Sequence, residues 1–444
     1  MKYTLLLFCT LFFHSIFSQE AIGVITDNFL PVNQVKLNPS EMVDQRPWLS
    51  INVTGAHGYI RNNFAYLKDT RLKFYKTEPT PVFDPPSSRF GKAFVVGEVL
   101  GPSATLAYKN QAFGIHTSVK TYANFNRIPA VVGQIIADES AENIEDGRYS
   151  ITNGRVKTMS WAQVGLSYGR TLYERNDIVI DGGITINRLI GIHQASLTMR
   201  EGVVDVINGN GTLRELDGKY SYTEPAFGAG HGWSTTLGFT YKKMNDYTDS
   251  YTPHSKGNGC KWLGYKYKIG ASLVDLGYIK FKQDARTASL PDTATVNDVE
   301  DINQDVLGVD KTKFTGVLPT ALSVKVDYNL KENFYVNLIV VQRIGLRNSF
   351  GVERSNLVTI SPRYESSLFT VSLPLSLANY ETPQLGLYFR VGPLALGTDH
   401  LSPFIIKRDQ RAASIYIYLN IALKAPGCRE GKVKKFAKWF CPVW

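Results

Sequence analysis

The chain has few cysteines and, beyond its first residues, no long apolar run. Only four of its 444 residues are cysteine. An apolar run from Thr4 to Phe17 follows Lys2 and ends at Ser18, the pattern of a cleaved signal peptide over residues 1–18. After this run no stretch approaches the roughly 18 apolar residues of a transmembrane helix. The remaining chain is therefore expected to contain no membrane-spanning helix.

Motifs of catalysis and metal binding are also missing. The sequence contains no GxSxG, HExxH or GxxxxGK[ST] arrangement and no Cys/His spacing typical of zinc. Several histidines are spaced without carboxylate partners, and ordinary structural roles are expected for them: His57, His193, His231, His254 and His400. We expect neither an enzyme nor a protein with a cofactor.

No Pro/Gly/Ser-rich linker divides the chain, although its length would suit more than one globular domain. Aromatic residues make up 12% and hydrophobic residues 43% of the chain. These values fit a wall with one lipid face and one wet face, and they fit a soluble β-sandwich equally well. The net charge of +10 would suit nucleic acid, but an export signal removes the chain from nucleic acid, which is not an expected partner.

Alternating apolar and polar residues recur in segments of about ten residues, the pattern of membrane β-barrel strands. One segment alternates from Trp233 to Lys242, and another from Leu322 to Leu330. Their polar faces carry lysine and aspartate, which a dry core would not accept without cost. About fourteen such segments can be counted. They predict an all-β, antiparallel transmembrane barrel over residues 48–424, in contact with outer-membrane lipid.

The connections between these segments alternate in length, as in barrels with short periplasmic turns and long outer loops. Short links are expected at 109–111, 174–177, 330–333, 363–366 and 392–393. Long loops are expected at 55–93, 123–157, 189–231 and 282–314. The links at 244–261 and 378–383 break the rule. The connections of a soluble β-sandwich are not expected to alternate between short and long in this way.

The segment Lys36-Leu37-Asn38-Pro39-Ser40, which precedes a first strand at Trp48, resembles the "LNPA" segment of FadL-like and PorP-type outer-membrane proteins. The Gly-rich blocks 270–277 and 392–399 resemble those of a Bacteroidota outer-membrane barrel family, some members of which carry an OmpA-like domain. The resemblance implies fourteen strands and an N-terminal segment, residues 19–47, folded into the lumen. No OmpA-like domain is recognised, so peptidoglycan anchoring is not expected, and no ligand-binding residue can be carried over.

Six charged residues are candidates for the lumen: Arg188, Lys242, Asp275, Lys325, Arg343 and Arg390. Asp275 interrupts an apolar block, so a bulge is expected there, with the side chain facing the lumen or the rim. A carboxylate facing the membrane would cost roughly 1–3 kcal/mol. The cationic residues would suit a pore for anions, or they would pair with acidic neighbours.

Acidic residues gather in two of the long connections, where they would bind calcium or form ordinary solvated loops. They are Asp138, Glu139, Glu142, Glu145 and Asp146 in one, and Asp292, Asp298, Glu300, Asp301 and Asp305 in the other.

The tail at residues 425–444 is basic and interleaved with aromatic residues. Such a tail would bind an anionic surface or a periplasmic or secretion-machine protein, or it would be a plain extension with a small disulfide loop. Cys428 and Cys441 are close in sequence and are candidates for that disulfide, which would leave Cys260 unpartnered.

Three hypotheses remain open. The leading one is an outer-membrane channel or transporter for an unidentified solute, a hydrophobic solute included. The alternative is a plugged barrel that serves as a scaffold for a secretion or gliding machine of the cell envelope. The third is a soluble, exported β-sandwich that binds polysaccharide.

Overall fold

A computed structural model describes most of the chain. The described residues are 20–43, 45–71, 81–84, 91–132, 134, 144–248, 251–255, 258–290, 312–345 and 350–428. The predicted signal peptide, residues 429–444 of the tail and most of the two acidic clusters lie outside the described residues.

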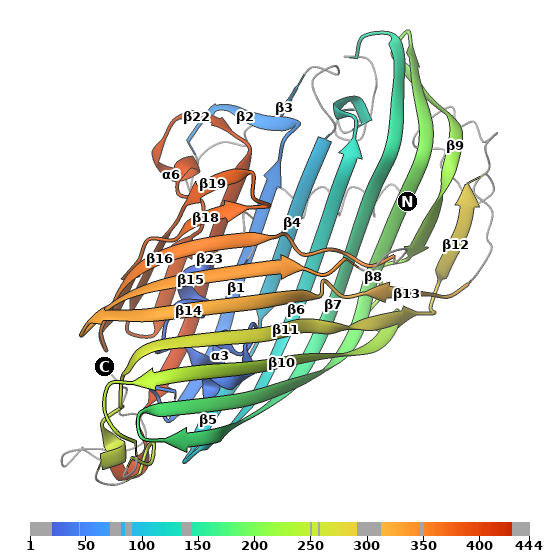
Figure 1. Ribbon diagram of the computed structural model, residues 1–444. Coiled ribbons are helices and arrows are strands. Elements are labelled where there is room, and N and C mark those ends of the chain that lie inside the picture. Colours follow the sequence, from blue (N-terminus) through green and yellow to red (C-terminus); the bar gives the residue numbers. More distant parts are fainter. Residues whose placement is uncertain are drawn as a thin grey trace.

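All but three of the described strands belong to one closed antiparallel barrel sheet (Figure 1). Closure is made by β1 (Leu49–Asn62), which pairs on one side with β23 (Ala412–Leu423) and on the other with β4 (Gly91–Leu100) and β5 (Ser103–Tyr108). Every backbone group along this wall can thus find a partner without an open sheet edge, which a membrane span requires.

The remaining wall strands follow one another in chain order around the barrel. They are β6 (Gln111–Ile128), β7 (Gly147–Arg175), β8 (Ile178–Ile207), β10 (Gly230–Met244), β11 (Tyr265–Phe281), β13 (Phe314–Val317), β14 (Ala321–Lys331), β15 (Phe334–Arg343), β16 (Leu357–Glu365), β17 (Phe369–Ser372), β18 (Leu375–Ala378), β19 (Thr382–Leu385), β20 (Leu387–Val391) and β21 (Leu394–Thr398). Four pairs of these segments, β4 with β5, β13 with β14, β17 with β18 and β19 with β20, each form one interrupted wall strand. The predicted antiparallel barrel of fourteen strands is therefore confirmed.

Side chains alternate across the wall as the sequence predicts. On β10 the side chains of Trp233, Leu237 and Phe239 are exposed, whereas Ser234, Thr236, Thr240 and Lys242 are buried in the lumen. Apolar positions point outward and polar positions point inward, the reverse of a soluble sandwich. The β-sandwich hypothesis is wrong for this chain.

The two longest strands correct the predicted loops. Residues 147–157 and 189–207 were expected in loops, but β7 and β8 are 29 and 30 residues long and stay paired from Arg175–Ile178 to Gly147–Val206. Two further strands, β9 (Asn210–Thr223) and β12 (Ala285–Leu290), extend this part of the sheet (Figure 1). Polar residues occur on both faces at this end, so the sequence loses the alternation that marks a strand.

Short elements lie at the same end of the barrel as the long loops. A small sheet contains β2 (Ala65–Thr70), β3 (Pro81–Phe83) and β22 (Arg408–Gln410). The helix α6 (Ser402–Ile405) precedes β22. We call this end, opposite the two-residue turns at 109–110 and 176–177, the mouth.

The N-terminal segment lies inside the barrel. It contains α2 (Ile22–Thr26), α3 (Pro31–Gln34) and η1 (Pro39–Met42), and Figure 1 shows α3 behind the front strands. We call residues 20–47 the plug segment; Asp44 is outside the described residues. Its residues are almost all buried, including polar ones such as Asn33 and Ser40. None of the described helices is long and apolar enough to cross a membrane.

The disulfide corrects a prediction. Cys260, in η2 (Asn258–Cys260), is bonded to Cys428, in η4 (Pro426–Cys428), with the Cα atoms 5.1 Å apart. The expected pairing of Cys428 with Cys441, with Cys260 left unpartnered, is wrong. The loop after β10 and the chain after β23 leave the barrel at the same end, so residues 168 positions apart meet. Cys441 lies outside the described residues.

This bond makes a first testable prediction. Peptide mapping of the unreduced protein should find a linked pair containing Cys260 and Cys428, because these two are adjacent in the folded chain. The linked pair should persist in Cys441→Ser and disappear in Cys260→Ser. A linked peptide joining Cys428 to Cys441 in the wild-type protein would contradict the structure.

Candidate functional site: the plugged lumen and its mouth

A row of lumenal glycines receives the plug segment. Gly183 on β8 is paired directly with Gly169 on β7 and with Gly238 on β10. A Cβ atom at Gly183 would lie 2.4 Å from the backbone nitrogen of Ser40, and one at Gly238 would lie 2.0 Å from Asn38 Oδ1. Three neighbouring strands thus lack side chains at the level where the plug touches the wall, since any side chain would displace it.

The Leu37-Asn38-Pro39-Ser40 motif is the part of the plug that sits on this row. Asn38 Oδ1 accepts hydrogen bonds from the Ser40 nitrogen (3.1 Å) and hydroxyl (2.7 Å), which caps η1. Pro39 occupies the first position of the helix, where no N–H donor is needed. Asn38 Nδ2 donates to Thr240 Oγ1 at 3.1 Å, and the Ser40 hydroxyl lies 2.7 Å from the same oxygen. The motif therefore folds a short turn and binds it to β10.

One buried carboxylate of the plug contacts two wall lysines. Glu41 Oε2 lies 2.7 Å from Lys325 Nζ and 3.0 Å from Lys268 Nζ. Lys325 also donates to the carbonyl oxygen of Ile25, at 3.1 Å. Burial acts to raise the pKa of Glu41, but Lys268 and Lys325 outweigh it and hold the pKa below its ordinary value. Glu41 is thus a charged group at neutral pH, and each lysine depends on it for a counter-ion.

A second buried carboxylate, Asp27, contacts β20. Its Oδ2 accepts from Arg390 Nε at 2.7 Å and from the Tyr388 hydroxyl at 2.8 Å. Burial raises the pKa of Asp27, but Arg390 and a hydrogen bond from the Phe29 nitrogen overcome this and lower it. The guanidinium of Arg390 also lies 4.6 Å from the centre of the Phe29 ring.

Two further ion pairs join the plug to the wall and to the mouth. Lys36 Nζ lies 2.6 Å from Glu98 Oε2 on β4. At the start of the plug, Glu20 Oε1 lies 2.6 Å from Arg354 Nη1, and Arg354 Nη2 lies 2.7 Å from Asp275 Oδ2. Burial raises the pKa of Glu20 even though Arg354 opposes the shift. The plug is held along its whole length by charges that the wall supplies.

Four of the six predicted lumen residues face the lumen. Lys242 lies 2.7 Å from Asp181, and Lys325 and Arg390 bind the plug as described. Asp275 also points inward. It has a positive φ of 52° at a bulge, where the register with β10 shifts between Thr235 and Leu237. Its carboxylate is thereby aimed at Arg354.

The other two predicted lumen residues lie elsewhere. Arg188 is on the outer face of β8, where its guanidinium lies 5.1 Å from the centre of the Trp233 ring and donates to the Gly232 carbonyl. It has the same parity as the outward-facing Ile186, so its assignment to the lumen was wrong. Arg343 ends β15 and is exposed at the mouth, 2.9 Å from Glu353, where it lines the polar cavity at the entrance of the lumen.

Sequence reasoning missed the acidic half of the site. Asp27, Glu41 and Glu98 were not identified as site residues from the sequence. In the structure they form ion pairs with Arg390, Lys325 and Lys36, respectively. His57 was given an ordinary role, and it lies in β1 with Nδ1 3.3 Å from Glu98 Oε2. The available signal was the occurrence of several charges in a short, mostly apolar segment that precedes the first strand. Among the described residues, no group of three His, Cys, Asp or Glu side chains could hold a metal ion.

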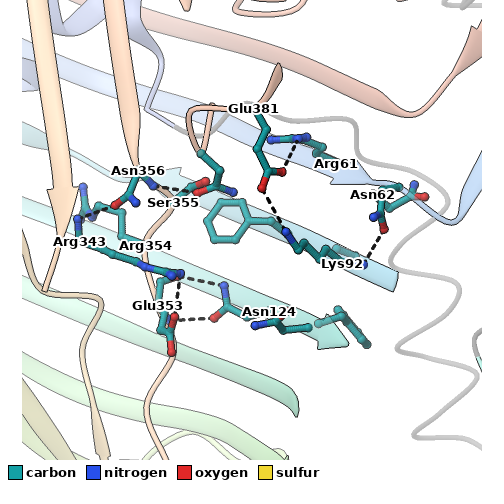
Figure 2. Close-up of a pocket in the computed structure, with 16 residues that line it drawn as sticks. Arg61, Asn62, Lys92, Asn124, Arg343, Glu353, Arg354, Ser355, Asn356 and Glu381 are labelled. Carbon is teal, nitrogen blue, oxygen red and sulfur yellow. Dashed lines mark hydrogen bonds and ion pairs between the residues drawn. The ribbon is translucent and has the colours of Figure 1, made fainter. Parts of the chain in front are cut away.

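The mouth of the lumen holds a polar cavity of about 220 Å³ (Figure 2). Glu381 lies near both Arg61 and Lys92, at 3.7 and 3.1 Å. Arg354 lines this cavity and also binds Glu20, so it belongs to both the cavity and the plug contacts. The further lining is amide-rich: Asn62, Asn63, Asn124, Asn126, Asn356 and Asn379.

Beside the plug the lumen is much tighter. Two cavities against Gln34 and Glu41 measure about 20 and 10 Å³, which is room for no more than single water molecules. The lumen and its mouth thus consist of an open polar chamber above a packed, ion-paired segment.

A family model described as a family of unknown function, DUF5723, matches residues 42–399. The chain belongs to the DUF5723 family. The match spans the wall strands from β1 to β21, whereas β23 follows it and most of the plug segment precedes it. No curated protein matches the sequence of this DUF5723 protein.

Several solved structures are similar to this DUF5723 protein at very low identity. The toluene transporter TodX of P. putida is 9% identical, with a TM-score of 0.42 and coverage of 91% of this chain and 98% of that chain. A TodX deltaS2S3 mutant, described as a monoaromatic hydrocarbon channel, is 9% identical with a TM-score of 0.44, over 87% and 93% of the two chains. A FadL homologue of Pseudomonas aeruginosa is 11% identical with a TM-score of 0.30, over 91% and 97%.

The Glu41 cluster makes a second prediction. Glu41→Gln removes the counter-ion of two buried lysines, which should lower the free energy of unfolding by about 3–5 kcal/mol. Denaturant unfolding followed by tryptophan fluorescence measures this. In Glu381→Gln, the lost pairs are half exposed, so the expected change is only about 0–1 kcal/mol. Equal stability of the two variants would show that Glu41 is not the buried partner described here.

The same cluster sets a pH dependence. The pKa values of Asp27 and Glu41 are depressed in the folded protein. Both residues therefore add to the free energy of unfolding when the pH is above the ordinary carboxyl pKa of about 4. This contribution is lost as the pH falls through the depressed values. The stability of the wild-type protein should therefore fall below about pH 4, and Glu41→Gln should fall less steeply.

The glycine row makes a third prediction. Gly183→Val should displace the plug, because the new side chain would occupy the position of the Ser40 backbone. Gly97→Val is the matched control, since a Cβ atom at Gly97 meets nothing within 4 Å. Protease digestion of the detergent-solubilised protein should release the N-terminal segment faster in Gly183→Val than in the wild type or the control. Equal rates in all three proteins would contradict the placement of the plug.

Proposed function

We propose that this protein is an outer-membrane channel for a small polar solute and that the structure is its closed state. The plug segment closes the lumen, and the cavity at the mouth receives the solute. The observation that carries the proposal is the position of Arg354, which lines the cavity and binds the first carboxylate of the plug. A solute that interacts with Arg354 would compete with Glu20 and loosen the plug.

The membrane location is supported by the outer surface of the wall. Large apolar side chains are exposed there on strands from every part of the barrel, for example Leu166, Phe239, Leu322 and Ile417. A soluble protein rarely exposes so continuous an apolar surface, whereas a bilayer covers it. Arg188 stacked on Trp233 resembles the aromatic and cationic residues found at the edges of such a belt.

The polar nature of the solute is supported by the lining of the cavity. Four cationic residues, two acidic residues and several asparagines contribute to it, beside the apolar side chains of Ala93, Phe94 and Phe125. A hydrophobic solute would displace water from these charges without supplying polar contacts of its own. The hydrocarbons named for the similar solved channels are thus not the ligands that this cavity favours.

The plug contacts support a lumen that can open. They include several ion pairs and hydrogen bonds, each of which can exchange for water or another ion. The apolar contacts of the plug with the wall are divided among three separate clusters rather than forming one continuous interface. Within the described residues, the plug is attached to the wall covalently only through the chain that leads into β1.

A second candidate function is a sealed scaffold for other envelope proteins. The small size of the cavities beside the plug favours it. The basic tail would then bind a periplasmic partner, and the Cys260–Cys428 bond would fix the base of that tail to the barrel. The two proposals differ in conductance, since a channel conducts when it opens and a sealed scaffold never conducts.

A fourth prediction separates the two functions. In planar bilayers the wild type should show rare openings, because the plug is held by ion pairs that exchange. Glu20→Gln should open more often, since Arg354 then loses one carboxylate. Deletion of residues 20–47 gives the conductance of the open barrel. Glu332→Gln, in a turn at the opposite end, is the control and should behave as the wild type.

Two results would contradict the channel. If the deletion variant conducts while the wild type and Glu20→Gln never open, the plug is a permanent seal and the scaffold is favoured. If the deletion variant inserts into the bilayer but does not conduct, the lumen is blocked by the wall itself.

A further inference from the structure

An apolar groove of about 520 Å³ lies on the outside of the barrel near the mouth, away from the lumen. Outward-facing residues of β16, β18 and β19 form one side, chiefly Val358, Ile360, Leu375 and Leu385. The segment that contains α6 forms the other side, with Ile405 and Ile406. Figure 1 shows α6 beside β18 and β19, at the same end as β22.

The groove exists because the chain after β21 bends over the wall. The backbone nitrogen of Leu401 donates to the carbonyl of Leu385 at 2.7 Å, which fixes this segment to the end of β19. The nitrogen of Ile406 then donates to the carbonyl of Ser402 at 2.9 Å and closes the single helical turn. The turn places apolar side chains over the outward leucines without filling the space between them.

Two polar atoms at this groove have no hydrogen-bond partner among the described residues. They are Nδ1 of His400 and Oγ of Ser402, both inaccessible to solvent in the protein alone. His400 is 7% exposed. Buried polar atoms are normally satisfied, so two unpaired atoms among the residues that line the groove favour a ligand that supplies a polar group.

The charge of the groove shows which polar group fits. Arg408 lines it and acts on His400 electrostatically, and burial together with Arg408 lowers the pKa of His400 to about 4. The histidine is therefore neutral at pH 7. Lys407 is exposed next to Arg408, and Arg71 donates to the Phe404 carbonyl in α6 at 2.9 Å. Arg408 lines the apolar groove, and Lys407 precedes it in the chain, which favours an anionic headgroup.

We propose that this groove binds one acyl chain of a phosphate-bearing lipid of the outer leaflet. The chain lies along the outward leucines and isoleucines, the phosphate lies beside Arg408 and Lys407, and His400 and Ser402 bind the polar atoms at the head of the chain. The inference rests on the proposed membrane location, since only there does hydrocarbon surround the groove. It does not depend on whether the lumen conducts.

A lipid-binding measurement on the intact purified protein tests this site. The probes are bis-phosphorylated lipid A and the same lipid A without phosphates, added to protein in detergent and counted by native mass spectrometry. The wild type should retain one phosphorylated lipid A. Arg408→Ala with Lys407→Ala should weaken that binding about tenfold, the effect of losing charge-assisted contacts, and should leave the unphosphorylated lipid unaffected.

A second variant tests the apolar half of the site. Leu377→Trp fills the groove and should abolish retention of both lipids, whereas Leu166→Trp, on an outward position of β7 far along the wall, should not. Unchanged retention in both groove variants, with the protein still inserting into bilayers, would overturn the site. Failure of the wild type to insert into bilayers would instead overturn the proposed membrane location.

Discussion

The fold depends on one constraint, which is that the inward face of the barrel carries charges that water does not reach. Lys268, Lys325 and Arg390 are buried in the lumen, and an uncompensated charge there would be costly. The plug segment supplies Glu41 and Asp27 at hydrogen-bonding distance. The barrel wall and the plug are thus complementary parts of one structure, and neither satisfies its charges alone.

The same alternation of side chains produces two surfaces with different chemistry. Inward positions make a charged lumen that ends in a polar cavity, and outward positions make an apolar wall with a groove beneath α6. We propose a ligand of a different kind for each cavity, a polar solute inside and a lipid chain outside. Arg354 and Glu20 connect the polar cavity to the plug. The apolar groove lies outside the lumen, and its lining contains no residue of the plug segment.

The strand pattern of the sequence was sufficient to predict the barrel, its strand number and the inward position of Lys242, Lys325 and Arg390, because a period of two is a local property. The ends of β7 and β8 could not be predicted, since both faces turn polar where the strands pass the apolar belt. The pairing of Cys260 with Cys428 and the row of Gly169, Gly183 and Gly238 depend on which strands become neighbours, and no local pattern contains that information. Arg188 was predicted to face the lumen, but it has the same strand parity as the outward-facing Ile186 and therefore lies on the outer face of β8.

The most direct test of the account is a cross-link between the plug and the wall in the intact outer membrane. Ser40 Oγ and Thr240 Oγ1 lie 2.7 Å apart, so the double variant Ser40→Cys/Thr240→Cys places two thiols together. We expect a disulfide to form under mild oxidation, seen as loss of both free thiols by mass spectrometry, and not in either single variant. Two thiols that stay free and react with a small maleimide would show that the plug does not occupy the lumen.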